Sequence, residues 1–579
     1  MASEFFSSPR VYFGNGSVNV LSRLNNKKVA IVTDEFMLTS GRTAYVTDQM
    51  PQATVSIYGK VRPDPGTDIL LEGAAQFKAF RPDVIIALGG GSSLDAAKGI
   101  RVTLEDHYQQ TGGQSKSIEL IAIPTTSGSG SEVTSYAIIS DPQNGRKYPL
   151  VSQALVPDTA ILDSELVLSL PRHIAVDTGM DVLTHAIEAL VSTGANDFSD
   201  ALAEKAIAIT WQSLPQIYAD EKNVAARTHM HNASCMAGMA FNSAGLGLVH
   251  GMAHAVGGML HIAHGKINAM LLPLVIEFNA AHASPETTAR YCQCARMIPG
   301  IAPAEPQQMI SQLVEKIRQL NLQFGIPRTL RELGTDLAVF ETMRLSLTET
   351  ALADGCTASN PYTPCRRDID QLLSCIAETG EYPAPQFTVP VGISNRHVHL
   401  CREDMDVLFG YGSTLTCLKK VRQPGQFAAE ETVTLRTPKG EIANVRVLGP
   451  LRSTTQIEIS VADGFVLGVK APVRMSGDLE NSPGIELVGP KGRVSKSQGT
   501  IVAWRHIHIS PQEAARYGLR EGMEIDLEAQ GQRAGILSHV LVRISAGAVL
   551  ELHIDVEEAN GLGLRNGDLV FRSGRGSHL

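Results

Sequence analysis

The sequence predicts a multidomain protein: an α/β domain, then an all-α domain, then an all-β domain built from two small barrels. At 579 residues the chain is too long for a single hydrophobic core, so two to four domains are expected. Short apolar runs alternate with amphipathic stretches from about Lys28, and long alanine- and leucine-rich segments replace them from Pro171. After a Pro- and Gly-rich segment, valines alternate with polar residues. These changes predict domains at 1–167, 168–380 and 390–579, with a linker at 381–389.

The first domain shows a strand–helix rhythm. VAIVTD, VSIYG and VIIALGGG have the composition of buried strands, and LLEGAAQFKAF and SLDAAKGIRVTL have the composition of helices. This alternation predicts a mostly parallel sheet covered by helices.

Two features of this domain point to a dinucleotide. VIIALGGGSSLDAAK runs from a strand through glycines into a helix, whose first N–H groups could hold a pyrophosphate, although the order is not GxGxxG. Asp34 ends the strand VAIVTD, where a carboxylate could bond ribose hydroxyls and repel a 2′-phosphate, which favours NAD over NADP. The alternatives are an ordinary glycine turn and a helix-capping Asp.

The all-α domain carries acid and imidazole side chains at helical spacing. Asp181 and His185 stand at i and i+4 in DTGMDVLTHAIEAL, and His250 and His254 repeat this spacing in GLGLVHGMAHAVGG. Residues at this spacing share a helix face, so each pair can point at one spot. The spacing alone does not say which of His250 and His254 binds a metal.

His264 follows His250 by 264 − 250 = 14 residues, which is about 21 Å along a straight helix. The two can share a metal only if the chain doubles back, and Gly257, Gly258 and the pair His264–Gly265 are candidate breaks. One carboxylate with three imidazoles suits iron(II) or zinc. A hydrogen-bonded core histidine is the alternative at each position.

At these residues the chain resembles a known family. DVLTHAIE, GLVHGMAH and AHGKINAMLLP resemble the metal-binding signature of the iron-activated (group III) alcohol dehydrogenases, over roughly the first two-thirds of the chain. The resemblance implies Fe2+ or Zn2+ bound by four residues, with His254 close to the reacting carbon as a proton relay. The implied ligands are Asp181, His185, His250 and His264.

The same resemblance covers the dinucleotide region. GGGSSLDAAK matches the family's GGGSxxDxAK, PTTSGSGSE resembles its TTxGTGSE, and Lys147 occupies its cofactor-side lysine position, unless it is simply a surface lysine. The closing NPR motif departs from the family, because Tyr362 replaces the arginine. The remaining implied cofactor residues are Gly90, Gly91, Ser92, Asp95, Thr125 and Thr126.

The last domain contains an internal repeat. NRHVHLCREDMDVLFGYGSTLT is echoed by WRHIHISPQEAARYGLREGMEI, and aligning the later segments places Glu458 opposite His553. Residues at i and i+2 of a strand face the same side, so each HxH pair can converge on one metal, for which zinc is favoured. The two candidate ligand sets are His397, His399 and Glu458, and His506, His508 and His553.

This third of the chain closely resembles the propanediol-utilisation type phosphate acyltransferases (phosphotransacylases), whose motifs RHVHL, GPxR and RHIHxS it carries. The resemblance implies two zinc ions held by those six residues, and transfer of an acyl group between coenzyme A and phosphate. Arg452 matches the family's phosphate-binding arginine, and a guanidinium beside two dications is a good phosphate receptor.

We therefore expect a bifunctional enzyme that reduces a short-chain aldehyde with NADH and converts acyl-CoA plus phosphate into acyl phosphate plus CoA. Oxidation of the same aldehyde to acyl-CoA would consume the NAD and CoA that these reactions regenerate. The alternatives are a dehydrogenase of polyols and a C-terminal module that only binds or scaffolds.

Composition limits the partners. A net charge of −9 without a Lys- or Arg-rich run argues against nucleic acid, and 8 scattered cysteines favour a reducing compartment. The N-terminus lacks a secretory pattern, and the most apolar stretch is too short to span a bilayer. We expect a homo-oligomer in the cytoplasm or inside a bacterial microcompartment, beside that compartment's enzymes.

Overall fold

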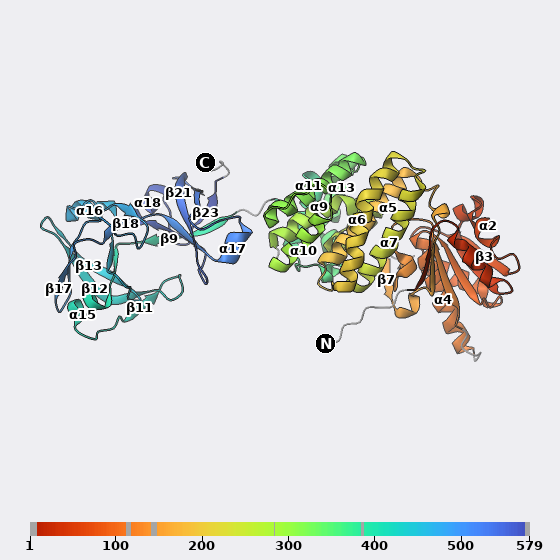
Figure 1. Ribbon diagram of the computed structural model, residues 1–579, viewed down its shortest axis with the longest axis horizontal. Coiled ribbons are helices and arrows are strands. Elements are labelled where there is room, and N and C mark those ends of the chain that lie inside the picture. The colour runs from red at the N-terminus through yellow and green to blue at the C-terminus, as the bar shows by residue number, and fades with distance from the viewer. Residues whose placement is uncertain (1–8, 112–116, 141–146, 283, 384–386, 574–579) are drawn as a thin grey trace. The chain divides into compact units, whose positions relative to one another are not determined.

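A computed structural model describes residues 9–111, 117–140, 147–282, 284–383 and 387–573 of the chain, and only the backbone of Lys147 and Arg516. The chain separates into two compact units, Met1–Ala384 and Pro385–Leu579 (Figure 1). The division falls inside the segment for which the sequence predicts a linker. The finer domain limits stay predictions.

The first unit begins with a six-stranded sheet of order β1-β8-β5-β4-β2-β3, in which every registered pair is parallel. Its strands are β1 (Arg10–Phe13), β2 (Lys28–Asp34), β3 (Thr54–Val61), β4 (Val84–Gly89), β5 (Glu119–Pro124) and β8 (Thr159–Leu162). A hairpin, β6 (Tyr136–Ser140) with β7 (Lys147–Val151), lies outside the sheet. The accompanying helices are α1 (Glu35–Thr39), α2 (Arg42–Thr47), α3 (Thr67–Lys78) and α4 (Gly91–Gln110).

The central strand β4 is buried at every position, because it is a continuous aliphatic run covered on both faces. One face packs on Leu94, Ile100 and the rest of the α3–α4 core, and the other packs on Met37, Val46 and their neighbours. The predicted α/β class is confirmed.

A helical layer follows, also as predicted. Its helices are α5 (Arg172–Val191), α6 (Asp197–Ala219), α7 (Val224–Ala244), α8 (Leu248–Leu260), α9 (His264–His282), α10 (Pro285–Arg296), α11 (Pro306–Gln323), α12 (Leu330–Leu333), α13 (Leu337–Ala353) and α14 (Arg366–Glu378). Figure 1 shows α5, α6 and α7 side by side. The second half of α5 is buried on all sides, as in a helix at the centre of a bundle.

The predicted break at Gly257 and Gly258 is wrong. Both glycines lie within α8, which ends at Leu260, and the chain turns at His261, whose φ of 54° is left-handed. The reversal needed to bring His264 back toward His250 is present, but it comes after the glycines.

The second unit contains the duplicated β structure. Its first repeat contributes to a nine-stranded sheet of order β15-β18-β14-β10-β13-β12-β16-β17 with β11 on β12, and its second repeat to a closed barrel of order β19-β21-β20-β23-β9-β22. The strands are β9 (Thr388–Ser394), β10 (His397–His399), β11 (Cys417–Lys420), β12 (Phe427–Arg436), β13 (Glu441–Gly449), β14 (Gln456–Glu458), β15 (Val473–Arg474), β16 (Glu486–Val488), β17 (Arg493–Ser495), β18 (Thr500–Ala503), β19 (His506–Ile509), β20 (Glu524–Ala529), β21 (Gly535–Ile544), β22 (Glu551–Asp555) and β23 (Leu569–Arg572). Short helices α15 (Arg402–Phe409), α16 (Val461–Leu467), α17 (Pro511–Arg516) and α18 (Val556–Leu562) connect them.

The repeats exchange a strand. β9, which precedes the first HxH strand, pairs with β22 and β23 of the second repeat. β18, which precedes the second HxH strand, pairs with β14 of the first repeat. Each repeat therefore completes the other's sheet.

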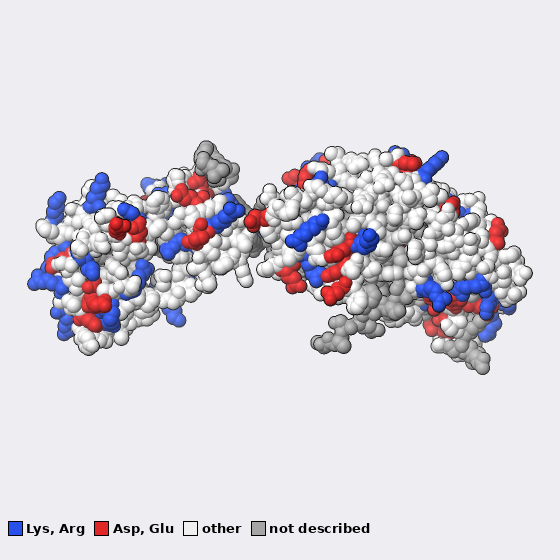
Figure 2. Space-filling model, viewed as in Figure 1, with Lys and Arg blue, Asp and Glu red and all other residues white. Residues whose placement is uncertain are grey.

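None of the described helices combines the length and apolar character needed to cross a membrane. On the described surface that faces the viewer in Figure 2, basic and acidic side chains are interspersed.

Candidate metal centres and cofactor cleft

Three helices bring together the predicted ligands of the first unit. Asp181 and His185 lie one turn apart on α5, His250 lies on α8, and His264 is the first residue of α9. Asp181 Oδ1 lies 3.8 Å from His185 Nε2, 3.5 Å from His250 Nε2 and 3.6 Å from His264 Nε2. The ligand atoms of Asp181, His185 and His250 thus all lie within 4.8 Å of one another, and the His264 ring approaches this group at Asp181 Oδ1.

The protonation of these groups differs from one ligand to the next. Burial raises the pKa of Asp181, but the imidazoles around it outweigh burial and hold that pKa well below its ordinary value. Burial lowers the pKa of His185 to about 4, so this ring is neutral at neutral pH. Burial also opposes the charged form of His250, yet hydrogen bonds to Asp181 and Glu188 raise its pKa to about 9.

Glu188, one helical turn beyond His185 on α5, orients His250. Its Oε2 lies 2.6 Å from His250 Nδ1, and its Oε1 accepts a 2.6 Å hydrogen bond from Val249 N. A carboxylate on Nδ1 fixes the tautomer that presents Nε2 to a metal. No motif in the sequence singles out Glu188, although its place seven residues after Asp181 puts it on the same helix face.

Asn268 fills the centre of the ligand set. Its Nδ2 lies 2.6 Å from Asp181 Oδ1, 3.2 Å from His250 Nε2 and 3.1 Å from His264 Nε2. Its own Oδ1 is buried without a hydrogen-bond partner. An amide nitrogen this close to a carboxylate oxygen and two ring nitrogens, beside an unsatisfied oxygen, occupies the point where a cation would bind, and the ligand set fits iron(II) or zinc.

Gly265 explains how His264 reaches this point. A Cβ at Gly265 would lie 1.9 Å from the carbonyl oxygen of Asp177, so only glycine allows α9 to begin this close to α5.

His254 lies beside the ligand set. Its ring stacks on His264 with centroids 5.3 Å apart, and its Nδ1 lies 2.9 Å from Asp354 Oδ2. The Asp354 bond leaves Nε2 of His254 free to exchange a proton with a bound molecule. Asp354 is 100 residues away in sequence and was not anticipated.

The predicted cofactor residues gather at one edge of the sheet. β2 ends at Asp34, β4 leads into Gly90 and Gly91, and β5 leads into Thr125 and Thr126. Gly90 lies against Thr126, because a Cβ there would be 3.5 Å from the threonine Cγ2. The carboxyl ends of neighbouring parallel strands are where nucleotides bind in such sheets.

Asp34 also caps α1, since its Oδ1 accepts from Met37 N at 3.0 Å, while its Oδ2 lies 3.4 Å from Ser93 Oγ. Asp34 therefore does cap a helix, which was the alternative to a cofactor role. The cap uses only one of its two carboxylate oxygens. The first turn of α4 has no side-chain cap, so its N–H groups, apart from that of Ser93, which donates to Gly90 O at 3.0 Å, are left for a phosphate.

The other predicted cofactor residues differ in accessibility. Ser92 lies in the first turn of α4 and its Oγ accepts from Asp64 N at 3.4 Å. Asp95 is buried, and its carboxylate accepts from Ser131 Oγ at 2.6 Å and from Ile138 N at 3.0 Å. These bonds hold the SGSGSE loop against α4, so Asp95 fixes the position of this loop rather than lying open to a ligand. The side chain of Lys147 lies outside the described residues.

In the second unit the first HxH pair faces a carboxylate. His397 Nε2 lies 3.3 Å from Glu458 Oε2, and His399 Nε2 lies 4.0 Å from Glu458 Oε1. Backbone carbonyls accept from Nδ1 of both rings, at 2.8 Å for His397 and 3.2 Å for His399, so both present Nε2. Burial lowers the pKa of His399 to about 3, which keeps that ring neutral.

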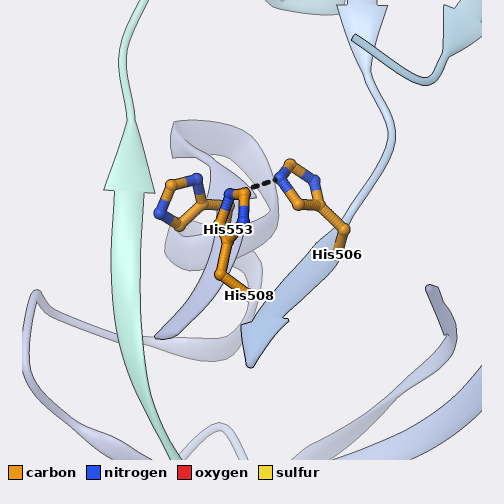
Figure 3. Close-up of side chains that lie close together, drawn as sticks. All are labelled: His506, His508 and His553. Carbon is orange, nitrogen blue, oxygen red and sulfur yellow. Dashed lines mark hydrogen bonds between the residues drawn. The ribbon is translucent and has the colours of Figure 1, made fainter. Parts of the chain in front are cut away.

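The second HxH pair forms an all-imidazole cluster (Figure 3). His506 and His508 project from β19 toward His553 on β22, and the two Nε2 atoms of the pair lie 3.2 Å apart. Burial lowers the pKa of His506 to about 4 and of His508 to about 3. Neutral imidazoles at this spacing are suited to zinc.

Two further residues hold His553. Its Nε2 lies 2.9 Å from Glu551 Oε2, which leaves Nδ1 as the nitrogen able to bind a metal. Gln423, from the first repeat, donates to Glu551 Oε2 at 3.2 Å and to Val549 O at 2.8 Å. Neither residue was anticipated, although the i, i+2 spacing of Glu551 and His553 puts them on one strand face.

Arg452 lies at the first of these clusters. Its Nη1 donates to Ser476 Oγ at 2.9 Å, and this hydroxyl lies 3.3 Å from Glu458 Oε1. Burial lowers the pKa of Arg452, and the Glu458 charge offsets part of this effect. The structure thus places the guanidinium beside a ligand set, with donors left for an anion.

Comparison with known proteins assigns both units. The family profile "Iron-containing alcohol dehydrogenase" matches residues 8–164, "Fe-containing alcohol dehydrogenase family, C-terminal" matches 175–377, and "Phosphate propanoyltransferase" matches 390–565. The chain belongs to both families. It is an iron-containing alcohol dehydrogenase fused to a phosphate propanoyltransferase-type enzyme, and hence a bifunctional enzyme.

Relatives support both halves of the fusion. The dehydrogenase part is 43% identical over 374 residues to the 1-propanol dehydrogenase PduQ of Salmonella typhimurium, covering 64% of this chain and 99% of the relative. The acyltransferase part is 56% identical over 192 residues to a phosphate propanoyltransferase of Rhodopseudomonas palustris, covering 33% of this chain and 85% of the relative. The iron-containing alcohol dehydrogenase structure from Thermococcus thioreducens aligns with a TM-score of 0.59 and 32% identity, over 65% of this chain and all of that chain.

Proposed function

We propose that the dehydrogenase part reduces a short-chain aldehyde, such as propanal, with NADH. The observation that carries this proposal is that Asp181, His185, His250 and His264 gather on and around α5, against which Gly128 of the loop after β5 packs so closely that a Cβ there would lie 2.8 Å from that of Thr178. The substrate class rests on the likeness to PduQ, named as a 1-propanol dehydrogenase. The Asp34 charge favours NAD over NADP.

The four ligands would hold iron(II) or zinc, which would supply Lewis-acid polarisation of the substrate oxygen. The protein then has to place the nicotinamide and the substrate in contact, and exclude water from the cleft. His254, fixed by Asp354 through Nδ1, would deliver a proton from Nε2 to the developing alkoxide.

In the second part, we propose transfer of a short acyl group between coenzyme A and phosphate, with two zinc ions. The ligands would be the two three-residue clusters, and the metals would polarise the thioester carbonyl or stabilise the thiolate. Arg452 would bind the attacking phosphate, held in place by Ser476.

The test uses the full chain and two variants. We expect His250→Ala to abolish NADH oxidation by propanal while phosphate-dependent release of CoA from propanoyl-CoA persists, and His506→Ala to show the reverse. A metal-loaded chain with neither activity would reject the proposal. Activity with glycerol in place of propanal would favour the polyol alternative, and an inactive zinc-loaded second unit would favour scaffolding.

A further inference from the structure

A third group of metal-ligating side chains lies beside the dehydrogenase site. His254, Asp354 and Cys356 each offer one ligand atom, and these atoms all lie within 4.8 Å of one another. The side chains of His254 and Asp354 are 33% and 18% exposed, so a cation can reach them from solvent. Cys356 is a free, half-buried cysteine.

The carboxylate already draws the other two residues together. Asp354 Oδ2 lies 2.9 Å from His254 Nδ1, while its Oδ1 accepts from the backbone N of Cys356 at 2.8 Å. The Cys356 sulfur lies within 4.8 Å of both an Asp354 carboxylate oxygen and a His254 ring nitrogen. An imidazole and a thiol therefore lie beside one carboxylate.

We propose that these three residues form an inhibitory zinc site, an inference that rests on the proposed role of His254. Ligands around a tetrahedral zinc lie roughly 3.3–3.8 Å apart, so closing the group needs shifts of only about 1 Å. Thiolate, imidazole and carboxylate together favour Zn2+ over the harder Mg2+ and Mn2+. This donor set contains a sulfur, whereas the proposed ligands of the other three centres are nitrogen and oxygen.

Binding exchanges protons for the cation. The Cys356 thiol loses its proton to solvent and its sulfur binds zinc, and the His254 proton moves from Nδ1 to Nε2 as Nδ1 binds. His254 then has no lone pair toward the substrate and cannot accept the proton of an alcohol. Excess zinc would stop the dehydrogenase while it fills the acyltransferase centres.

The experiment titrates the metal-free full chain with Co2+, then with Zn2+. Of the ligand groups among the described residues, this one alone contains a sulfur, so thiolate-to-cobalt charge-transfer absorption in the near ultraviolet reports on it. We expect that absorption in the wild type and in the control Cys365→Ser, whose cysteine is exposed and outside the group, and its loss in Cys356→Ser. Subsequent addition of Zn2+ should displace Co2+ and abolish this absorption.

A second measurement follows activity. In the iron-loaded chain we expect Zn2+ to inhibit alcohol oxidation with the iron content unchanged, and Cys356→Ser to need at least tenfold more Zn2+. Absence of the thiolate absorption, equal inhibition of the variant, or loss of iron in step with inhibition would overturn the proposal. An iron-loaded chain without dehydrogenase activity would instead reject the proposed function, because the cobalt spectrum does not depend on turnover.

Discussion

Glu188 Oε2 lies 2.6 Å from Nδ1 of His250, across 62 residues of sequence. The two side chains are both buried, and the carboxylate faces the ring from the side opposite Asp181. This pairing decides which nitrogen of His250 is available to a metal, and it also sets how many protons a metal must displace.

Replacing Glu188 with glutamine should weaken metal binding by the first unit. The amide keeps the shape but not the charge that fixes the ring, and loss of such a partner typically costs roughly 10–100-fold in affinity. Competition with a chelating dye measures the dissociation constant of Co2+. Glu286→Gln, at an exposed position of α10, is the matched control, and equal affinity in both variants would contradict the role of Glu188.

Metal binding should release a proton below pH 9. Hydrogen bonds to Asp181 and Glu188 raise the pKa of His250 to about 9, so the metal-free ring carries a proton at pH 7 that a cation must displace. Affinity should therefore rise about tenfold per pH unit up to that pH, and then level off. Calorimetry in buffers of different ionisation enthalpy counts the proton, and a count near zero at pH 7 would refute this assignment.

Glu551→Gln should selectively lower zinc occupancy at the second acyltransferase centre. The carboxylate holds Nε2 of His553, and without its charge the ring can bind through either nitrogen. We expect roughly 10–100-fold weaker binding of one zinc per chain, unchanged dehydrogenase activity, and no effect of the exposed control Glu528→Gln. Two tightly bound zinc ions in the second unit of the variant would show that Glu551 is dispensable.

Asp34→Asn should relax discrimination against NADPH. Asn retains the cap on Met37 N and removes the charge that would repel a 2′-phosphate, so α1 should stay intact. The ratio of kcat/KM for NADH to that for NADPH should fall at least tenfold. Asp34→Gly should show the same shift, and an unchanged ratio in both variants would remove Asp34 from the cofactor site.

The features that the sequence predicted correctly are those that follow from local periodicity. Asp181 with His185, and His506 with His508, share a face because helices repeat every 3.6 residues and strands every two. The three fold classes followed from the same patterns.

The rest depends on how distant elements pack. Asp354 reaches His254 across 100 residues, and Gln423 reaches Glu551 across 128, so no local pattern contains either pair. The misplaced break has a local cause: glycines are tolerated inside α8, whereas His261 takes the left-handed turn that was assigned to them.

The crossed strands β9 and β18 limit how the second unit can be divided. A fragment that starts at residue 390 would lack Thr388 and Val389, which pair with Phe571 and Val570 and join β9 to β23. A fragment that holds one repeat alone would expose a sheet edge with unpaired backbone N–H and C=O groups. A second molecule could pair with that edge. Truncated versions of the acyltransferase should therefore begin before Thr388 and keep both halves, or they will be recovered as dimers and aggregates.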